Sequence, residues 1–196
     1  VENMTRVPIG SDAITANKKM SKPIGRSYFE QREFTSQFEA AERLAEKYQL
    51  TRSDTDNFGL QSQTRAKTAI ENGHFDSQII AIEAPEMDDD FERTDTMLSV
   101  SRDEVPRDTS LEALAGLKSV AREDGVHTAG TSSQIADGAA AVLMMSASKA
   151  QALGLTPVAI IRASALVGCD PVMMLEGPIP ATEKMLKQTG LDISDI

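Results

Sequence analysis

Apolar and polar residues follow a helical period in the segment after residue 35. The apolar positions are three or four residues apart and share one helix face: Phe38, Ala41, Leu44, Ala45 and Tyr48. Ser36 and Glu39 have the spacing of a capping box just before this stripe. The pattern therefore predicts a helix that starts after Ser36.

Two further helices are predicted in the same half of the chain. One begins near Ser53 and Asp54 and stops at Gly73, because glycine is the residue that most often ends a helix. A shorter helix, capped by Asp108 or Thr109, carries a row of leucines: Leu111, Leu114 and Leu117.

The segment between these helices is apolar at first and then strongly acidic. A strand is predicted by its isoleucines: Ile79, Ile80 and Ile82. Residues 83–95 predict a solvated loop, because blocks of like charge are usually solvated. The run Asp88-Asp89-Asp90 lacks the glycine and final glutamate of a calcium-binding loop, so we expect an exposed turn and no metal site.

After residue 125 the pattern changes to short apolar runs separated by helices. Two runs predict strands buried on both faces, Gly138–Met145 and Val158–Leu166. A helix capped by Ser146 and ended by Gly154 lies between them. A Gly/Pro-rich loop follows, and then two last elements: a helix from Ala181 to Gly190 and the start of a strand over 191–196.

This order of strands and helices predicts an α/β fold with a layered sheet. The mainly helical part before residue 125 is then an insertion that lies on the sheet. The chain opens on Val1 rather than Met, and it closes on an unpaired strand start. We therefore expect both ends to be truncations of a longer protein.

Composition excludes several classes of function. Thirty acidic and twenty basic residues give a net charge of −10, which disfavours a nucleic-acid partner. One cysteine in 196 residues excludes a disulfide framework and fits a reducing compartment. No apolar run approaches the roughly 20 residues that cross a bilayer. Together these features predict a cytoplasmic protein with no membrane span.

Few residues offer chemistry of their own. Cys169 is the obvious nucleophile candidate, but the adjacent Asp170 would raise its pKa, so a small residue in a loop is the favoured interpretation. His74 and His127 stand alone in the sequence, and two histidines without further spaced ligands do not predict a metal site.

The run from Thr128 to Ala141 is different. Its small side chains let a ligand approach the backbone, and its hydroxyl groups offer hydrogen bonds. It leads directly into a predicted buried strand, which would hold it rigid. Composition alone leaves two interpretations open, a tight structural turn or a binding loop.

A resemblance favours the binding loop. The stretch TAGTSSQIADGAAAVLMM, which starts at Thr128, is similar to the corresponding stretch of the thiolase family, although many thiolases have Asn where this chain has Thr131. Three further stretches resemble the family in the same order, so that the likeness covers essentially the whole chain: Val1–Thr5, the two helices with Ala41-Glu42 and Leu50-Thr51-Arg52, and Gly168–Thr182.

The resemblance implies a thiolase-like layered αβαβα fold, present in part, with a helical loop domain. It implies these boundaries: 1–10 as the end of the N-terminal half, 11–134 as the CoA-binding loop domain, 135–154 as the return to the N-terminal half, and 155–196 as the start of the C-terminal half. The parent would be an acyl-CoA:acetyl-CoA C-acyltransferase that acts on coenzyme A thioesters, holds no permanent cofactor and forms homodimers or homotetramers.

The family's nucleophilic cysteine lies upstream of this stretch, and its other catalytic motifs lie downstream. The resemblance therefore places no catalytic residue in this chain and implies that the chain alone is inactive. Two alternatives stay open: a non-catalytic thiolase-like protein that binds lipid or CoA thioesters, and a helical interaction module.

Residue by residue, the resemblance assigns Ser133 to the pantetheine arm of CoA and Ala129 and Ser132 to the same CoA-lining loop. Met174 matches a methionine in the wall of the acyl pocket. The family's His-Met pair before the first loop-domain helix is replaced by Ser36-Gln37, and several CoA-contacting positions near 106–121 are Pro or Ala. The candidates for contacts with the CoA phosphates, each equally a solvated surface charge, are Arg102, Arg107, Lys118 and Arg122.

Overall fold

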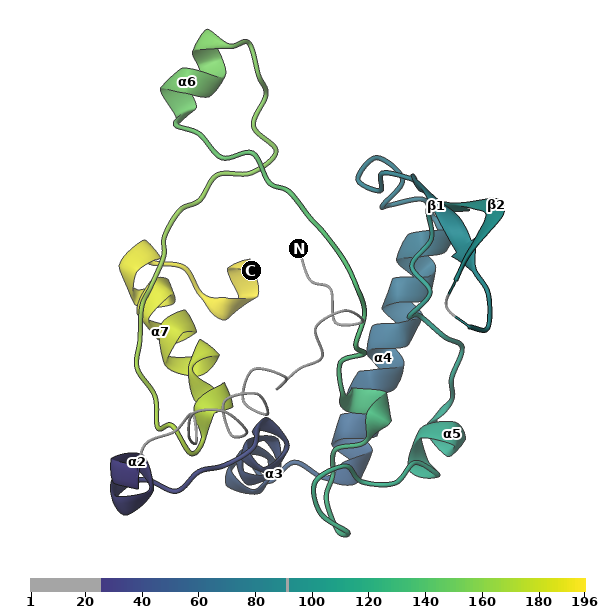
Figure 1. Cartoon of the computed structure of the whole chain (residues 1–196). Coiled ribbons are helices and arrows are strands. Elements are labelled where there is room, and N and C mark those ends of the chain that lie inside the picture. Colours follow the sequence, from purple (N-terminus) through teal and green to yellow (C-terminus); the bar gives the residue numbers. More distant parts are fainter. Residues whose placement is uncertain (1–25, 91) are drawn as a thin grey trace. The chain divides into compact units, whose positions relative to one another are not determined.

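The computed structural model describes residues 26–90 and 92–196, which form two compact units (Figure 1). The first unit comprises residues up to Leu50 together with Ile135–Ile196, and the second is Thr51–Gln134. The predictions for residues 1–10 and for the Val1–Thr5 stretch lie outside the described residues. The predicted domain boundaries stay predictions.

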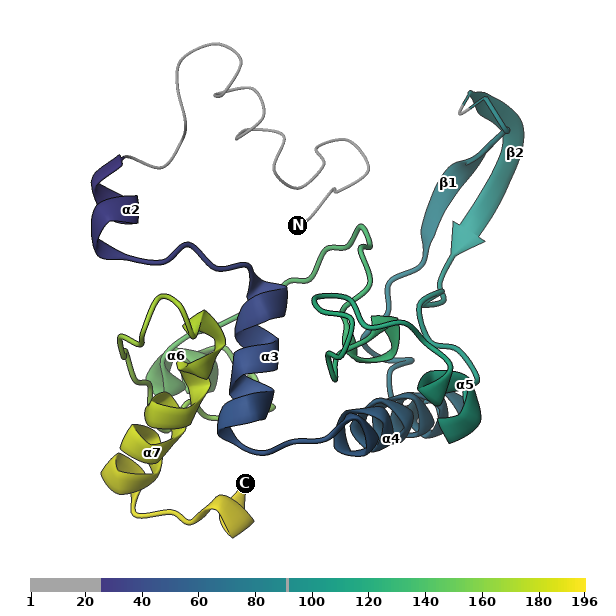
Figure 2. The same ribbon diagram turned by 90° about the horizontal axis from the view of Figure 1, so that it is seen from below.

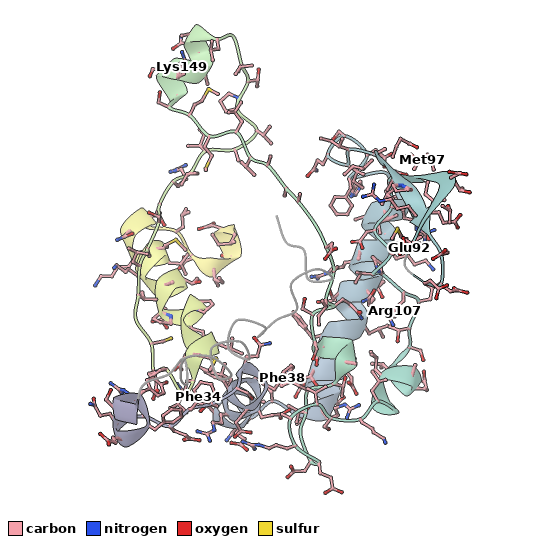
Figure 3. The ribbon with its side chains drawn as sticks, viewed as in Figure 1. Phe34, Phe38, Glu92, Met97, Arg107 and Lys149 are labelled. Atoms are coloured by element: carbon pink, nitrogen blue, oxygen red, sulfur yellow. The ribbon has the colours of Figure 1, made fainter. Side chains whose placement is uncertain are left out.

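The first unit opens with α2 (Arg26–Gln31) and α3 (Gln37–Lys47). The predicted start of α3 is confirmed, because the Ser36 hydroxyl accepts a hydrogen bond from the Glu39 amide at 3.1 Å. The predicted apolar stripe is buried only in part. Ala45 is buried and Ala41 and Leu44 are half-buried, whereas Phe38 (Figure 3) and Tyr48 are exposed. The helix also buries Ala40 and Glu42, which lie outside the stripe.

Two more helices of this unit follow their end signals. α6 (Ala147–Ala152) is capped by Ser146 and is followed by Gly154 in the left-handed region, as predicted. α7 (Pro178–Thr189) ends at Gly190, also left-handed, but begins before the predicted Ala181. The earlier start has a simple cause, because proline fits the first turn of a helix, where its missing N–H has no partner to lose.

The two predicted buried strands do not form ladders in the described part of the chain. Beyond a single bridge residue at Gly138, residues 138–145 and 158–166 have no strand assignment. They are exposed except for the half-buried Ala163 and Ala165, and Val158 is fully exposed. An apolar run becomes a strand only when neighbouring strands pair with its backbone. The predicted strand start at 191–196 is also wrong, because this segment holds the 3₁₀ turn η3 (Ile193–Asp195).

The second unit is organised on its longest helix, α4 (Arg52–Glu71). Its start agrees with the one predicted near Ser53 and Asp54, and its N-cap Thr51 forms a reciprocal capping box with Asp54. The predicted stop is confirmed, since Gly73 follows the helix with a φ of +67°.

The acidic segment predicted as a loop is mostly a β-hairpin. β1 (Ile82–Met87) pairs antiparallel with β2 (Arg93–Val100), and Ile82 lies opposite Val100. The hairpin projects as an arm from the helices of its unit (Figure 2), and Glu92 and Met97 mark it in Figure 3. The predicted exposed turn is confined to the tip. There the Asp88 carboxylate accepts hydrogen bonds from the backbone amides of Asp90 and Glu92.

The predicted leucine helix is α5 (Leu111–Ala115). Its cap is Ser110 rather than Asp108 or Thr109, because the Ser110 hydroxyl accepts a hydrogen bond from the Ala113 amide at 3.2 Å. Leu114 is the buried member of the leucine row, with 4% of its surface exposed.

Arg52 joins α4 to the end of α5. Its Nε donates to both carboxylate oxygens of Asp56, at 3.0 and 2.9 Å. Its Nη2 donates to the carbonyl oxygens of Leu114 and Leu117, at 2.7 and 2.9 Å. The Leu114 carbonyl also accepts from the Leu117 amide at 3.0 Å, so the guanidinium adds a charged donor where α5 ends.

Two glycines allow a second close contact on α4. A Cβ added at Gly59 would lie 2.8 Å from the carbonyl oxygen of Gly130, and one added at Gly130 would lie 2.4 Å from Cδ2 of Leu114. The backbone of residues 128–131 therefore packs directly on α4. No helix among residues 26–90 and 92–196 is both long and apolar enough to cross a membrane.

We predict that Arg52→Met destabilises the chain by about 2–3 kcal/mol, since it leaves carbonyls and a buried carboxylate without their charged donor. Urea unfolding followed by circular dichroism measures the change. Arg65→Met removes an exposed arginine from the same helix and is the matched control. Equal midpoints for the two variants would contradict the role given to Arg52.

Alanine in place of glycine normally stabilises a helix interior by up to about 1 kcal/mol. We predict the opposite sign for Gly59→Ala, a net loss on the order of 1–2 kcal/mol, because the new methyl group meets a backbone carbonyl that cannot rotate away. The same unfolding experiment tests it, with Ser62→Ala on the exposed side of α4 as the control. An increase in stability for Gly59→Ala would refute the close contact.

Candidate functional site

The serine- and threonine-rich run begins with a tight, internally bonded turn, η1 (Ala129–Thr131). Thr128 is fully buried, and its hydroxyl accepts from the Gly130 amide at 3.1 Å. The Thr131 hydroxyl accepts from the Thr128 amide at 3.1 Å, which completes a capping box. The Ser132 hydroxyl donates to the Thr128 carbonyl at 2.8 Å. Thr131, where many thiolases carry Asn, thus serves to close the turn.

The rest of the unit supports this turn from its inner side. Ser119 and Thr128 form an antiparallel bridge, and the Val120 amide donates to the His127 carbonyl at 3.1 Å. On α4, the Thr55 hydroxyl donates to the carbonyl of Val126 at 2.7 Å. The turn is therefore held at its entry by a neighbouring loop and by a helix.

The outer side of the turn carries the predicted binding residues. Ala129 and Ser133 are exposed, and Ser132 is half-buried. Within the described part of the chain, the Ser133 hydroxyl donates a local bond to the Gln134 carbonyl at 3.2 Å. The tight structural turn is therefore confirmed, and the binding loop stays a prediction, which the exposed small residues of the turn allow.

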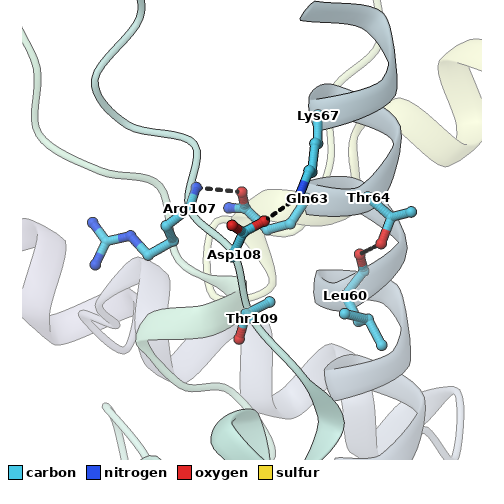
Figure 4. Close-up of a pocket in the computed structure, with 7 residues that line it drawn as sticks. All are labelled: Leu60, Gln63, Thr64, Lys67, Arg107, Asp108 and Thr109. Carbon is cyan, nitrogen blue, oxygen red and sulfur yellow. Dashed lines mark hydrogen bonds and ion pairs between the residues drawn. The ribbon is translucent and has the colours of Figure 1, made fainter. Parts of the chain in front are cut away.

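A hollow of about 260 Å³ lies in the same unit, between α4 and the chain before α5 (Figure 4). It contains Arg107, whose backbone amide donates to Oε1 of Gln63 at 3.1 Å and whose guanidinium points away from Gln63. Lys67 pairs with Asp108 at 2.8 Å, and this hydrogen bond lowers the pKa of the Asp108 carboxyl. Leu60, Thr64 and Thr109 complete its lining.

The other cationic candidates are not gathered into this hollow's lining. Arg102 and Lys118 are exposed, and Arg122 is half-buried. Sequence reasoning missed Lys67 and Gln63. The only available signal was their i, i+4 spacing, which puts both on one face of α4.

Met174 belongs to the first unit, in the 3₁₀ turn η2 (Met174–Glu176). The Met174 side chain is half-buried, and its carbonyl accepts from the Cys169 thiol at 3.5 Å. The Glu176 carboxylate pairs with Lys47 and accepts from Tyr48, both from the C-terminal end of α3. This long-range contact within the chain was not predicted, because residues 47 and 176 are far apart in sequence.

The remaining candidates have local roles. The exposed Cys169 lies in the loop before η2, and His74 is exposed just after α4. His127 lies 3.4 Å from the Thr131 hydroxyl, against the tight turn. In the part of the chain that the structure describes, no three His, Cys, Asp or Glu side chains come close enough to hold a metal ion.

Sequence comparison agrees with this geometry. A family model described as thiolase, N-terminal domain, matches residues 1–148. The 3-ketoacyl-CoA thiolase of Marinomonas sp. (strain MWYL1) is 46% identical over 80% of this chain and 39% of its own length. The 3-ketoacyl-CoA thiolase of Idiomarina loihiensis is 41% identical over 100% of this chain and 48% of its own length. The chain thus spans less than half the length of these curated relatives.

Structural comparison points the same way. The crystal structure of the Bacillus anthracis acetyl-CoA acetyltransferase matches with a TM-score of 0.75 and 39% identity, over 84% of this chain and 40% of that one. This likeness confirms the predicted fold class, a partial thiolase-like α/β fold. The motif resemblance, the family match over 1–148 and the likeness to solved thiolases agree, and this chain belongs to the thiolase family.

Proposed function

We propose that this chain supplies the CoA-binding loop and part of the acyl-pocket wall of an acyl-CoA:acetyl-CoA C-acyltransferase. The observation that carries the proposal is the supported turn at 128–133, which presents Ala129 and Ser133 to solvent from a rigid base. A preorganised polar loop binds a ligand without a large cost for ordering it. The relatives named 3-ketoacyl-CoA thiolase and acetyl-CoA acetyltransferase support the CoA thioester as the ligand class.

Ser133 would contact the pantetheine arm, with Ala129 and Ser132 lining the same loop. The Ser133 hydroxyl can exchange its bond to the Gln134 carbonyl for one to an amide of the ligand, since both are single neutral hydrogen bonds. Thr128 and Thr131 would not touch the ligand, because their hydroxyls are used inside the turn.

Arg107 is the favoured phosphate contact. The chain carries a net charge of −10, so an anionic ligand needs a local cationic group rather than help from the overall charge. The Arg107 backbone amide is bonded to Gln63, while the guanidinium points away from Gln63 (Figure 4) and the residue is exposed. A guanidinium held in this way can form two parallel hydrogen bonds to a phosphate.

Met174 would form part of the acyl-pocket wall. The segment 11–134 would be the loop domain, flanked by 1–10 and 135–154 of the N-terminal half, and 155–196 would open the C-terminal half. In the whole protein the reaction would be an acyl transfer in two stages. A cysteine thiolate takes the acyl group and releases the first carrier, and a second carrier then attacks the resulting thioester and frees the cysteine. This chain would bind and position the CoA thioester.

We further propose a cytoplasmic homodimer or homotetramer that works in fatty-acid or lipid metabolism. A non-catalytic thiolase-like protein that binds lipid or CoA thioesters would use the same loop. It would differ in the residues that form the covalent intermediate. A helical interaction module would bind no CoA, so a measurement of CoA binding distinguishes it from the other two.

We expect free CoA to bind this chain and Ser133→Ala to weaken binding about three- to tenfold, the loss of one or two neutral hydrogen bonds. Isothermal titration calorimetry gives the dissociation constant. Ser99→Ala, at an exposed position of the hairpin, is the control and should bind like the unchanged chain. No binding by a folded chain would favour the interaction module, and equal constants for Ser133→Ala and the control would remove Ser133 from the site.

Arg107→Gln should weaken binding of CoA about tenfold and leave binding of pantetheine, which lacks the phosphates, unchanged. The difference should shrink as salt is raised, because screening acts on the charged contact alone. Arg65→Gln, on the exposed surface of α4, controls for the loss of one positive charge. A parallel loss for pantetheine would show that Arg107 acts on the fold rather than on the phosphates.

A further inference from the structure

One carboxylate joins α3 to the loop that carries Met174. The Glu176 carboxylate is paired with Nζ of Lys47 and accepts a hydrogen bond from the Tyr48 hydroxyl at 3.3 Å. Its side chain is only 18% exposed, although it comes from a short turn. The Lys47 ammonium also lies over the Tyr48 ring, 5.5 Å from the centroid. Three side chains thus form one cluster, which we call the α3 clamp: Lys47, Tyr48 and Glu176.

The loop that the clamp holds is compact but only lightly bonded. The Asp170 carboxylate accepts from the Val172 amide at 2.8 Å, and the Cys169 thiol donates to the Met174 carbonyl at 3.5 Å. Both bonds stay inside the loop. The clamp is the charged tie that the described residues show between η2 and α3, and Glu176 closes the same turn in which Met174 lies.

We infer that Glu176 is a positioning residue: through Lys47 and Tyr48 it fixes η2 on α3, and so sets where Met174 bounds the acyl pocket and which acyl chain lengths fit. The inference rests on the proposed function, since it takes Met174 as pocket wall. A turn of three residues has little rigidity of its own. The position of η2 is therefore set by the groups that tie it to α3.

The clamp has a defined range of pH. The hydrogen bond from Lys47 lowers the pKa of Glu176 below its ordinary value of 4.5, and Tyr48 adds to this while Asp170 opposes it. The hydrogen bond to Glu176 raises the pKa of Lys47 above 10.5. A lowered carboxyl pKa means that the tie is complete above pH 4.5 and is lost as the pH falls through the lowered value.

The test compares Glu176→Gln, Lys47→Met and Lys47→Arg with the unchanged chain, and Lys187→Met on α7 controls for loss of a surface lysine. The first readout is the rate at which iodoacetamide alkylates Cys169, the only cysteine of the chain. The second is the ratio of the dissociation constants for acetyl-CoA and octanoyl-CoA. Glu176→Gln and Lys47→Met should speed alkylation and shift the ratio toward octanoyl-CoA, each roughly threefold or more. Lys47→Arg and Lys187→Met should change neither.

A third measurement varies the pH. The unchanged chain should shift its ratio in the same direction as the pH falls below 4.5 through the lowered pKa of Glu176, and Glu176→Gln should not. Faster alkylation with an unchanged ratio would overturn the inference while leaving CoA binding intact. Failure of the unchanged chain to bind either thioester would overturn the proposed function, and this inference with it.

Discussion

Arg52 lies in the first turn of α4 and donates to the carbonyl oxygens of Leu114, at the end of α5, and of Leu117, just after it. Asp56, one turn further along, holds the guanidinium in place through both carboxylate oxygens. The packing of α5 on α4 depends on this one charged group because the apolar core is small. Among the described residues, the buried hydrophobic side chains are few and mostly small: Ala40, Ala45, Leu114 and Ala150. Directional bonds therefore decide the arrangement of the second unit.

The same helix sets the geometry of the proposed CoA loop. Arg52 fixes α5, Thr55 holds the carbonyl of Val126, and Gly59 lets the backbone at Gly130 approach closely. These three residues are spaced three and four apart, so they lie on one face of α4. A single helical face thus supports the inner side of a turn whose outer side carries Ser133. The small residues of the turn allow close packing on its inner side and leave room for a ligand on its outer side.

The first unit shows what charged ties do where apolar burial is small. Its long extended segments expose Val142, Val158 and Leu166 almost completely, and their backbones find no ladder partners in the described part of the chain. The α3 clamp, in contrast, brings together residues 47 and 176, more than a hundred positions apart. Within this unit the position of η2 depends on a few polar groups, so single substitutions there should have local rather than global effects.

Local signals in the sequence determined where several helices begin and end. Ser36, Ser146, Gly73, Gly154 and Gly190 act at these points as predicted, because capping and left-handed glycines depend on bonds within a few residues. The motif starting at Thr128 was enough to indicate the family. Ser110 was missed as a cap because the neighbouring Asp108 and Thr109 compete for the same role.

Tertiary structure alone decided the features that depend on distant partners. The acidic segment pairs as a hairpin because its two arms meet in register, which charge content does not reveal. The apolar runs at 138–145 and 158–166 have strand-like composition, yet strand formation requires partner backbones that composition cannot supply. Likewise, the sequence pointed to Ser133 and Met174 but not to Thr55, Gly59 or Lys47. These three act through contacts across the fold, and nothing in their own sequence neighbourhoods marks them.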